Sequence, residues 1–105
     1  MSNFKVQHDD EEIIKQLDKI FVNFEVIYTD FIKKKDKLDL YGKAPISIAL
    51  SEPVEEMIHY ICANLKNELG MECTKSSLIE KMILYVLSDP KILSNFIATI
   101  YGIAR

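Results

Sequence analysis

Tryptophan is absent from this chain of 105 residues, and glycine, proline and cysteine are scarce. Two cysteines, Cys62 and Cys73, are too few for a disulfide scaffold and do not form a Cys-x-x-Cys pair. A four-ligand zinc site would need both of them and both histidines, so we expect no metal and no cofactor. The isolated glycines exclude a glycine-rich phosphate loop, and no Gly-x-Ser-x-Gly motif occurs. We therefore expect a protein that is not an enzyme and has no catalytic residues.

Long hydrophobic runs are also missing. The longest uncharged stretch, residues 92–104, is too short to span a bilayer. The N-terminal residues are acidic and lack the apolar region of a signal peptide. We therefore expect a cytoplasmic protein with no membrane partner. What is present is the composition of a globular domain, with 49% hydrophobic and 28% charged residues.

Charge is distributed unevenly along the chain. The net charge is −3, but residues 33–50 hold five lysines against two acidic residues. Four of these lysines lie in Lys33–Lys37, and Lys43 follows. Cations at this position suit the carboxyl end of a helix, and they equally suit contact with phosphates.

The first segment, about residues 8–37, has the pattern of one long helix. Apolar residues repeat at alternating spacings of three and four, as in the seam of a coiled coil. These residues are Ile14, Leu17, Phe21, Phe24, Tyr28 and Phe31. The dense β-branched and aromatic residues of 21–29 leave a strand open as an alternative there.

A strand and two helices are expected next. Ile46, Ile48 and Leu50 alternate with Ser47 and Ala49, which is typical of a half-buried strand. A helix with acidic residues in its first turn follows the strand, and it ends where glycine can adopt a left-handed conformation. A second helix then covers about residues 75–87, and a short last helix covers residues 91–101. The signals that mark these helix ends are Ser51, Gly70, Thr74 and Pro90.

One strand cannot pair its own backbone groups. Either residues 21–29 form a second strand, or Ile46–Leu50 pairs with its copy in another chain. The second interpretation predicts an intermolecular antiparallel ribbon, with Ile46, Ile48 and Leu50 in the core of an obligate homodimer.

The order of strand, helix, glycine turn and helix over about residues 43–87 resembles the ribbon-helix-helix DNA-binding proteins of the Arc, MetJ and CopG type. The resemblance is carried by Ile46–Val54, by Leu69-Gly70 and by Thr74–Ile79. It implies a mainly α-helical homodimer with a long N-terminal helix and a short C-terminal helix added. The expected division is 1–42, 43–88 and 89–105.

The resemblance also implies the site. The outward side chains of the ribbon, Pro45, Ser47 and Ala49, would face base edges in double-stranded DNA. The start of the second helix, Thr74, Lys75, Ser76 and Ser77, would bind phosphate, with Lys43 beside it. Such a protein would act as a transcriptional repressor or a plasmid partition protein that binds centromere sites, with higher-order assembly on DNA as a further expectation.

The outward residues depart from the family, whose ribbons usually carry bidentate donors. Pro45, Ser47 and Ala49 have one hydroxyl among them. This leaves a second interpretation open, a dimeric protein-interaction module related to antitoxins or conjugation accessory proteins, with weak or lost DNA binding. In either interpretation, the N-terminal or the C-terminal helix would contact a second protein, or both helices would serve packing alone.

Overall fold

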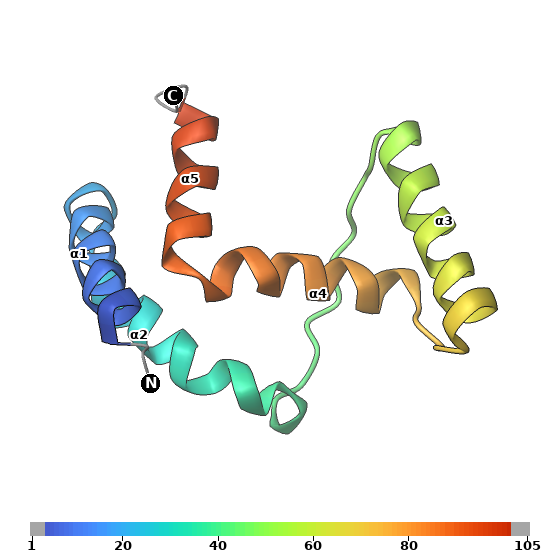
Figure 1. The fold of residues 1–105 in the computed structure, drawn as a ribbon, viewed down its shortest axis with the longest axis horizontal. Helices are drawn as coiled ribbons and strands as arrows, with labels where there is room; N and C mark the ends of the chain where they lie inside the picture. Colours follow the sequence, from blue (N-terminus) through green and yellow to red (C-terminus); the bar gives the residue numbers. More distant parts are fainter. Residues whose placement is uncertain (1–3, 102–105) are drawn as a thin grey trace. The chain divides into compact units, whose positions relative to one another are not determined.

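The computed structural model describes residues 4–101, with side chains placed over residues 10–100. Within this part the chain is mainly helical, with five α-helices, one short 3-10 helix (η1) and no strand (Figure 1). The chain divides into two compact units. Unit 1 consists of the described parts of Met1–Tyr41 and Leu84–Arg105, and unit 2 is Gly42–Ile83. The boundary at Ile83 and Leu84 falls inside α4.

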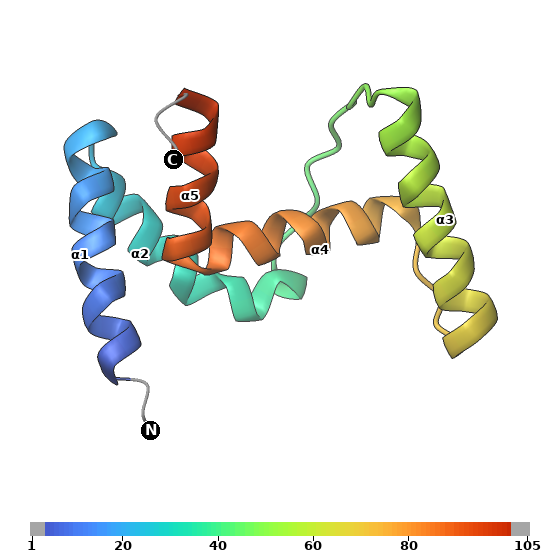
Figure 2. The ribbon, with the colours of Figure 1, turned by 45° about the horizontal axis from the view of Figure 1, so that its top comes forward.

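Unit 1 contains the elements from both ends of the described chain (Figure 2). They are α1 (Phe4–Ile20), α2 (Phe24–Lys34), η1 (Lys35–Leu40), the last part of α4 (Lys75–Ser88) and α5 (Pro90–Tyr101). The prediction of one long N-terminal helix is wrong, because the chain turns back between α1 and α2, which pack against each other. The repeating apolar seam therefore lies on two short helices that cover each other.

The break between α1 and α2 has a local cause. Asn23 adopts a left-handed conformation with φ 61° and ψ 25°, which no helix can continue through. Asparagine tolerates this conformation better than most residues. The carboxylate of Asp18 accepts a hydrogen bond of 2.8 Å from the backbone N–H of Glu25 in the first turn of α2. A residue of α1 thus satisfies one of the N–H groups that the start of α2 leaves without a helical acceptor.

The core of unit 1 is formed by three buried side chains, Leu17, Tyr28 and Leu93. They come from α1, α2 and α5, so the core joins both ends of the described chain. The ring of Tyr28 stacks on Phe24 with ring centres 5.1 Å apart. Its hydroxyl donates a hydrogen bond of 2.6 Å to the carbonyl oxygen of Leu87. Further half-buried apolar residues surround this core: Ile13, Ile14, Phe21, Phe31, Ile32, Val86 and Ile97.

The break between α4 and α5 lies where Asp89-Pro90 predicted the end of a helix. Asp89 precedes Pro90, and its carboxylate accepts a hydrogen bond of 2.9 Å from the backbone N–H of Lys91. Pro90, at the first position of α5, needs no acceptor because it has no N–H group. The expected C-terminal helix is therefore present, and it begins one residue earlier than predicted.

Unit 2 contains α3 (Glu52–Leu69) and the larger part of α4. Gly70 ends α3 with φ 67°, and its N–H bonds to the carbonyl oxygen of Lys66 at 3.0 Å. This confirms the predicted role of Gly70 as the glycine at the helix end. Thr74 precedes α4, and its hydroxyl oxygen accepts a hydrogen bond of 3.1 Å from the N–H of Ser77. The predicted cap of the second helix is confirmed as well.

The ribbon is where the structure contradicts the sequence-based fold. Residues 42–50 form no strand, and Tyr41 before them and Ser51 after them have extended backbones. Residues 21–29, the alternative source of a second strand, form a turn at 21–23 and the start of α2 from residue 24. The described chain therefore has no second strand for this segment to pair with, and alternation of side chains alone does not make a strand without a neighbour. The prediction of a ribbon-helix-helix fold with an intermolecular two-stranded ribbon is wrong for this structure.

Candidate nucleic-acid interface

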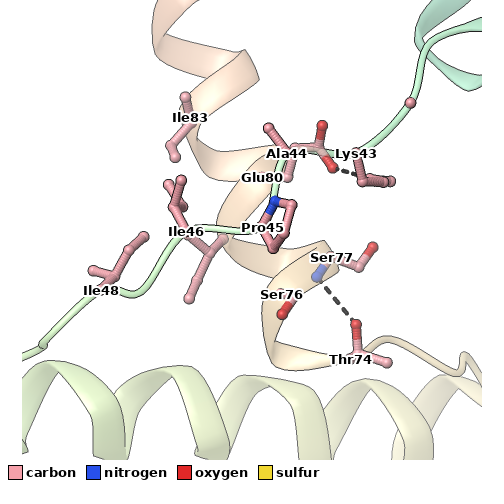
Figure 3. Close-up of a pocket in the computed structure, with 12 residues that line it drawn as sticks. Lys43, Ala44, Pro45, Ile46, Ile48, Thr74, Ser76, Ser77, Glu80 and Ile83 are labelled. Atoms are coloured by element: carbon pink, nitrogen blue, oxygen red, sulfur yellow. Dashed lines mark hydrogen bonds and ion pairs between the residues drawn. The ribbon is translucent and has the colours of Figure 1, made fainter.

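A groove in unit 2 brings together the predicted phosphate-binding residues and the extended segment (Figure 3). Its volume is about 780 Å³, and it lies between residues 42–48 and the first three turns of α4. Polar residues line it at one end and apolar residues at the other. The lining residues are Gly42, Lys43, Ala44, Pro45, Ile46, Ile48, Thr74, Ser76, Ser77, Ile79, Glu80 and Ile83. Of the predicted phosphate-binding residues, only Lys75 does not line it.

The amino end of α4 supplies the hydrogen-bond donors of the groove. Thr74 satisfies the N–H of Ser77, whereas the N–H groups of Lys75 and Ser76 precede the first acceptor that the helix can offer. The hydroxyls of Thr74, Ser76 and Ser77 lie in the same groove. A helix start of this kind carries partial positive charge and binds anions through its backbone N–H groups.

Both lysines of the predicted site are engaged by carboxylates. The ammonium group of Lys43 lies 3.0 Å from a carboxylate oxygen of Glu80. Lys75 forms an ion pair with Glu55 of α3, and this hydrogen bond lowers the pKa of the Glu55 carboxyl below its usual value. Each pair lies at the surface, where ion pairs contribute about 0–1 kcal/mol to stability. An incoming phosphate would therefore displace either carboxylate at little cost, although the displaced carboxylates stay nearby and oppose a second anion.

The three residues predicted to face bases are all exposed, but they differ in whether they line the groove. Pro45 lines the groove, and Ser47 and Ala49 do not. Their assignment to base edges depended on a strand, and they lie instead in the unpaired extended segment. Base reading by these three residues therefore stays a prediction without the ribbon that motivated it.

The residues predicted as a dimer core are exposed in the single chain. Ile46 is 76% exposed, Ile48 52% and Leu50 39%. Ile46 and Ile48 line the groove beside Ile83 of α4 (Figure 3), and Leu50 lies outside it. Other large apolar side chains of unit 2 are also exposed, namely Val54, Met57, Tyr60, Leu69, Met71 and Met82.

Two acidic residues of the site, Glu80 and Glu55, were not predicted as members of it. Glu80 lies four residues after Ser76 on α4, and helical residues four apart share a face. That spacing would have placed a carboxylate beside the phosphate-binding residues. Glu55 was expected only as a favourable charge at the start of α3, and sequence spacing does not indicate that α3 brings it to Lys75.

No family model, curated protein or solved structure matches this chain. Among the residues whose side chains are described, no three His, Cys, Asp or Glu lie close enough together to hold a metal ion. No single helix of the described part is long and apolar enough to cross a membrane; α4 and α5 reach that length only together, across a bend of 99°.

Proposed function

We propose that the protein binds double-stranded DNA as a small homodimer, with the start of α4 contacting the phosphate backbone. The observation that carries the proposal is the groove, which joins Lys43 to the hydroxyls of Thr74, Ser76 and Ser77. A lysine, several hydroxyls and unpaired helical N–H groups are the donors with which proteins bind DNA phosphates. The sequence resemblance over Thr74–Ile79, described above, implies phosphate binding at the same helix start.

The homodimer is supported by the exposed apolar side chains of unit 2. Exposed apolar side chains that gather on one surface are typical of a protein–protein interface, and Ile46, Ile48 and Ile83 gather in this way in the groove. A dimer would also place two copies of the α4 start on one DNA molecule, which suits repeated or palindromic sites. In this proposal the phosphate contacts fix the position of the protein, and they contribute affinity without sequence preference.

The test uses opposite charge changes in the groove. Lys43→Gln removes a cation and should lower the slope of log affinity against log salt by roughly 1 per site. Glu80→Gln removes the carboxylate that engages Lys43, so it should strengthen binding. Lys81→Gln, an exposed lysine of α4 that does not line the groove, is the matched control. Fluorescence anisotropy with DNA flanking the protein's own gene and with scrambled DNA, at two salt concentrations, measures all three.

The DNA affinities of the three variants show whether the groove contacts DNA. Weaker binding by Lys43→Gln, tighter binding by Glu80→Gln and only a small change by Lys81→Gln would support the groove as the DNA contact. Equal effects of Lys43→Gln and Lys81→Gln would mean that only overall charge matters, and the assignment of the groove would be wrong.

A second function is favoured by the ion pairs. Lys43 and Lys75 are each matched by a carboxylate, so the four charged side chains cancel. A groove without net positive charge suits a dimeric protein-interaction module in which a helix of unit 1 contacts a second protein. Weak binding to both DNA fragments, with little dependence on salt, would favour this function.

A further inference from the structure

Three titratable side chains lie together beside the start of α4, and we refer to Glu55, His59 and Lys75 as the Glu55 cluster. Lys75 is the first residue of α4, and its ammonium group pairs with the carboxylate of Glu55 on α3. His59 follows Glu55 by four residues on α3, and helical residues with this spacing share a face. All three belong to unit 2. Glu55 is therefore the carboxylate that a lysine of α4 and a histidine of α3 have in common.

Both partners act on the charge of Glu55. The hydrogen bond and the charge of Lys75 lower the pKa of the Glu55 carboxyl, desolvation opposes them, and His59 adds a smaller lowering. The side chains of Lys75 and Glu55 are 48% and 45% exposed, and His59 is exposed as well. An ion pair at such a surface contributes little and exchanges readily with competing charges. A second cation beside Glu55 can therefore weaken its hold on Lys75.

The other charged side chains of this part of unit 2 have different positions or partners. Glu56 precedes His59 by three residues, so it is the second carboxylate on that face of α3. Across from α3, Lys75 is the cation that α4 contributes. The two remaining ion pairs of unit 2 join Lys43 to Glu80 and Lys66 to Glu72.

We propose that protonation of His59 releases Lys75 from Glu55 and so strengthens phosphate binding at the start of α4 as the pH falls. Histidine is the side chain whose charge ordinarily changes between about pH 5 and pH 8. While His59 is neutral, Glu55 and Lys75 cancel each other and the cluster offers an anion no net charge. Once His59 is protonated, two cations share one carboxylate and the cluster is positive. This inference rests on the proposed function, because the phosphate that Lys75 would bind belongs to DNA.

The direction of the pH effect follows from which form binds DNA better. Phosphate favours the protonated cluster, so DNA binding takes up a proton, and affinity rises as the pH falls. A lysine that is released adds about one phosphate contact. Between about pH 8 and pH 6 this should raise DNA affinity by about threefold or more, and the salt slope by up to about 0.9 per site.

DNA affinity at these two pH values tests the switch, measured by fluorescence anisotropy on the full chain with the DNA that flanks its own gene. His59→Gln should lose most of the gain on acidification, whereas His8→Gln, which removes the one other histidine, should keep it. Glu55→Gln frees Lys75 at both pH values, so it should bind more tightly at the higher pH and gain little at the lower. Glu56→Gln, which removes the neighbouring carboxylate, should keep the wild-type gain.

Two results of this experiment would overturn the inference. An equal gain in the wild type and in His59→Gln would mean that the pH effect does not come from His59. A full wild-type gain in Glu55→Gln would mean that protonated histidine attracts DNA directly, without any release of Lys75.

The free protein provides a test that needs no DNA. The carbon NMR signal of the Lys75 Cε atom reports whether the ammonium group is paired. On acidification it should move towards its position in Glu55→Gln, and it should do so in the wild type but not in His59→Gln. A signal that stays constant in the wild type would contradict the inference whether or not the protein binds DNA. The expected movement, together with no DNA binding at either pH, would contradict the proposed function alone.

Discussion

Tyr28 of α2 is part of the unit 1 core, and its hydroxyl also forms a hydrogen bond with α4. Its ring lies among the buried side chains, and its hydroxyl donates to the carbonyl of Leu87 near the end of α4. The last carbonyl groups of a helix have no N–H donor within the helix. The hydroxyl of Tyr28 supplies a donor to one of them here. Tyr28 therefore contributes apolar burial and a hydrogen bond to the same unit.

Replacing Tyr28 with phenylalanine keeps the ring and removes the hydrogen bond. We expect Tyr28→Phe to lower the free energy of unfolding of unit 1 by about 1–3 kcal/mol, because the Leu87 carbonyl loses its partner. Tyr85→Phe is the control, since the Tyr85 side chain is 69% exposed. Urea unfolding followed by circular dichroism measures both variants. Equal stability of Tyr28→Phe and Tyr85→Phe would contradict the role of this hydrogen bond.

The same tyrosine makes a prediction for alkaline pH. Burial, followed by the negative charges of Asp10 and Asp89, raises the pKa of Tyr28 from 10.0 to about 12. A raised pKa in the folded state means that the neutral hydroxyl is favoured there, so its contribution is complete below pH 10 and is lost as pH rises towards 12. The difference in stability between wild type and Tyr28→Phe should therefore shrink over this interval. A constant difference across the same pH range would contradict the assignment.

At the scale of the elements, local signals predicted helix ends well. Gly70, Thr74 and Asp89-Pro90 act through groups only a few residues away, so the sequence contains what determines them. The break at Asn23 was missed because the apolar seam continues through it. A seam with this spacing fits one long helix or two helices that cover each other, and only the fold distinguishes the two.

The site was predictable in part for the same reason. The cap by Thr74 and the hydroxyls after it follow from local sequence, and the structure places them in one groove. The meeting of Lys75 with Glu55 depends on how the chain turns between α3 and α4, which no spacing reveals. The ribbon was wrong because alternation at Ile46, Ile48 and Leu50 describes side chains, whereas a strand also needs a backbone partner.

Gly70 and Gly42 provide a matched test of the helix end. Both have open space where a Cβ atom would lie, but only Gly70 has a positive φ. Gly70→Ala should destabilise unit 2 by about 1–2 kcal/mol, because a left-handed conformation is unfavourable for alanine. Gly42→Ala should leave stability unchanged or raise it by up to about 1 kcal/mol by restricting the unfolded chain. Urea unfolding at one fixed protein concentration measures both, and an equal response would contradict a left-handed helix end at Gly70.

At the scale of the whole molecule, unit 1 is built from two separate parts of the chain. Residues of α1 and α2 share a core with α5, while the chain between them forms unit 2. A cut within the exposed segment 42–50 would therefore leave both parts of unit 1 intact. Packing of Leu17 and Tyr28 against Leu93 should hold the two fragments together.

Limited proteolysis tests this arrangement. Trypsin should cut early after Lys43, whose side chain is 84% exposed and lies outside every helix. The two fragments should elute together in native buffer and separate in denaturant. Lys43→Gln should remove this cut without changing elution of the intact chain. Fragments that separate in native buffer would show that unit 1 is not held together by its shared core.

The hydrogen bond between Tyr28 and Leu87 also has a consequence for synthesis on the ribosome. Its two residues are 59 positions apart, and α5 follows the second of them. At about 5–20 residues per second, Leu87 is made roughly 3–12 s after Tyr28. During that interval the apolar faces of α1 and α2 can cover only each other, and all of unit 2 is made before the unit 1 core can be completed. The nascent chain therefore exposes apolar surface until α5 emerges, and this is the period in which a chaperone would bind it.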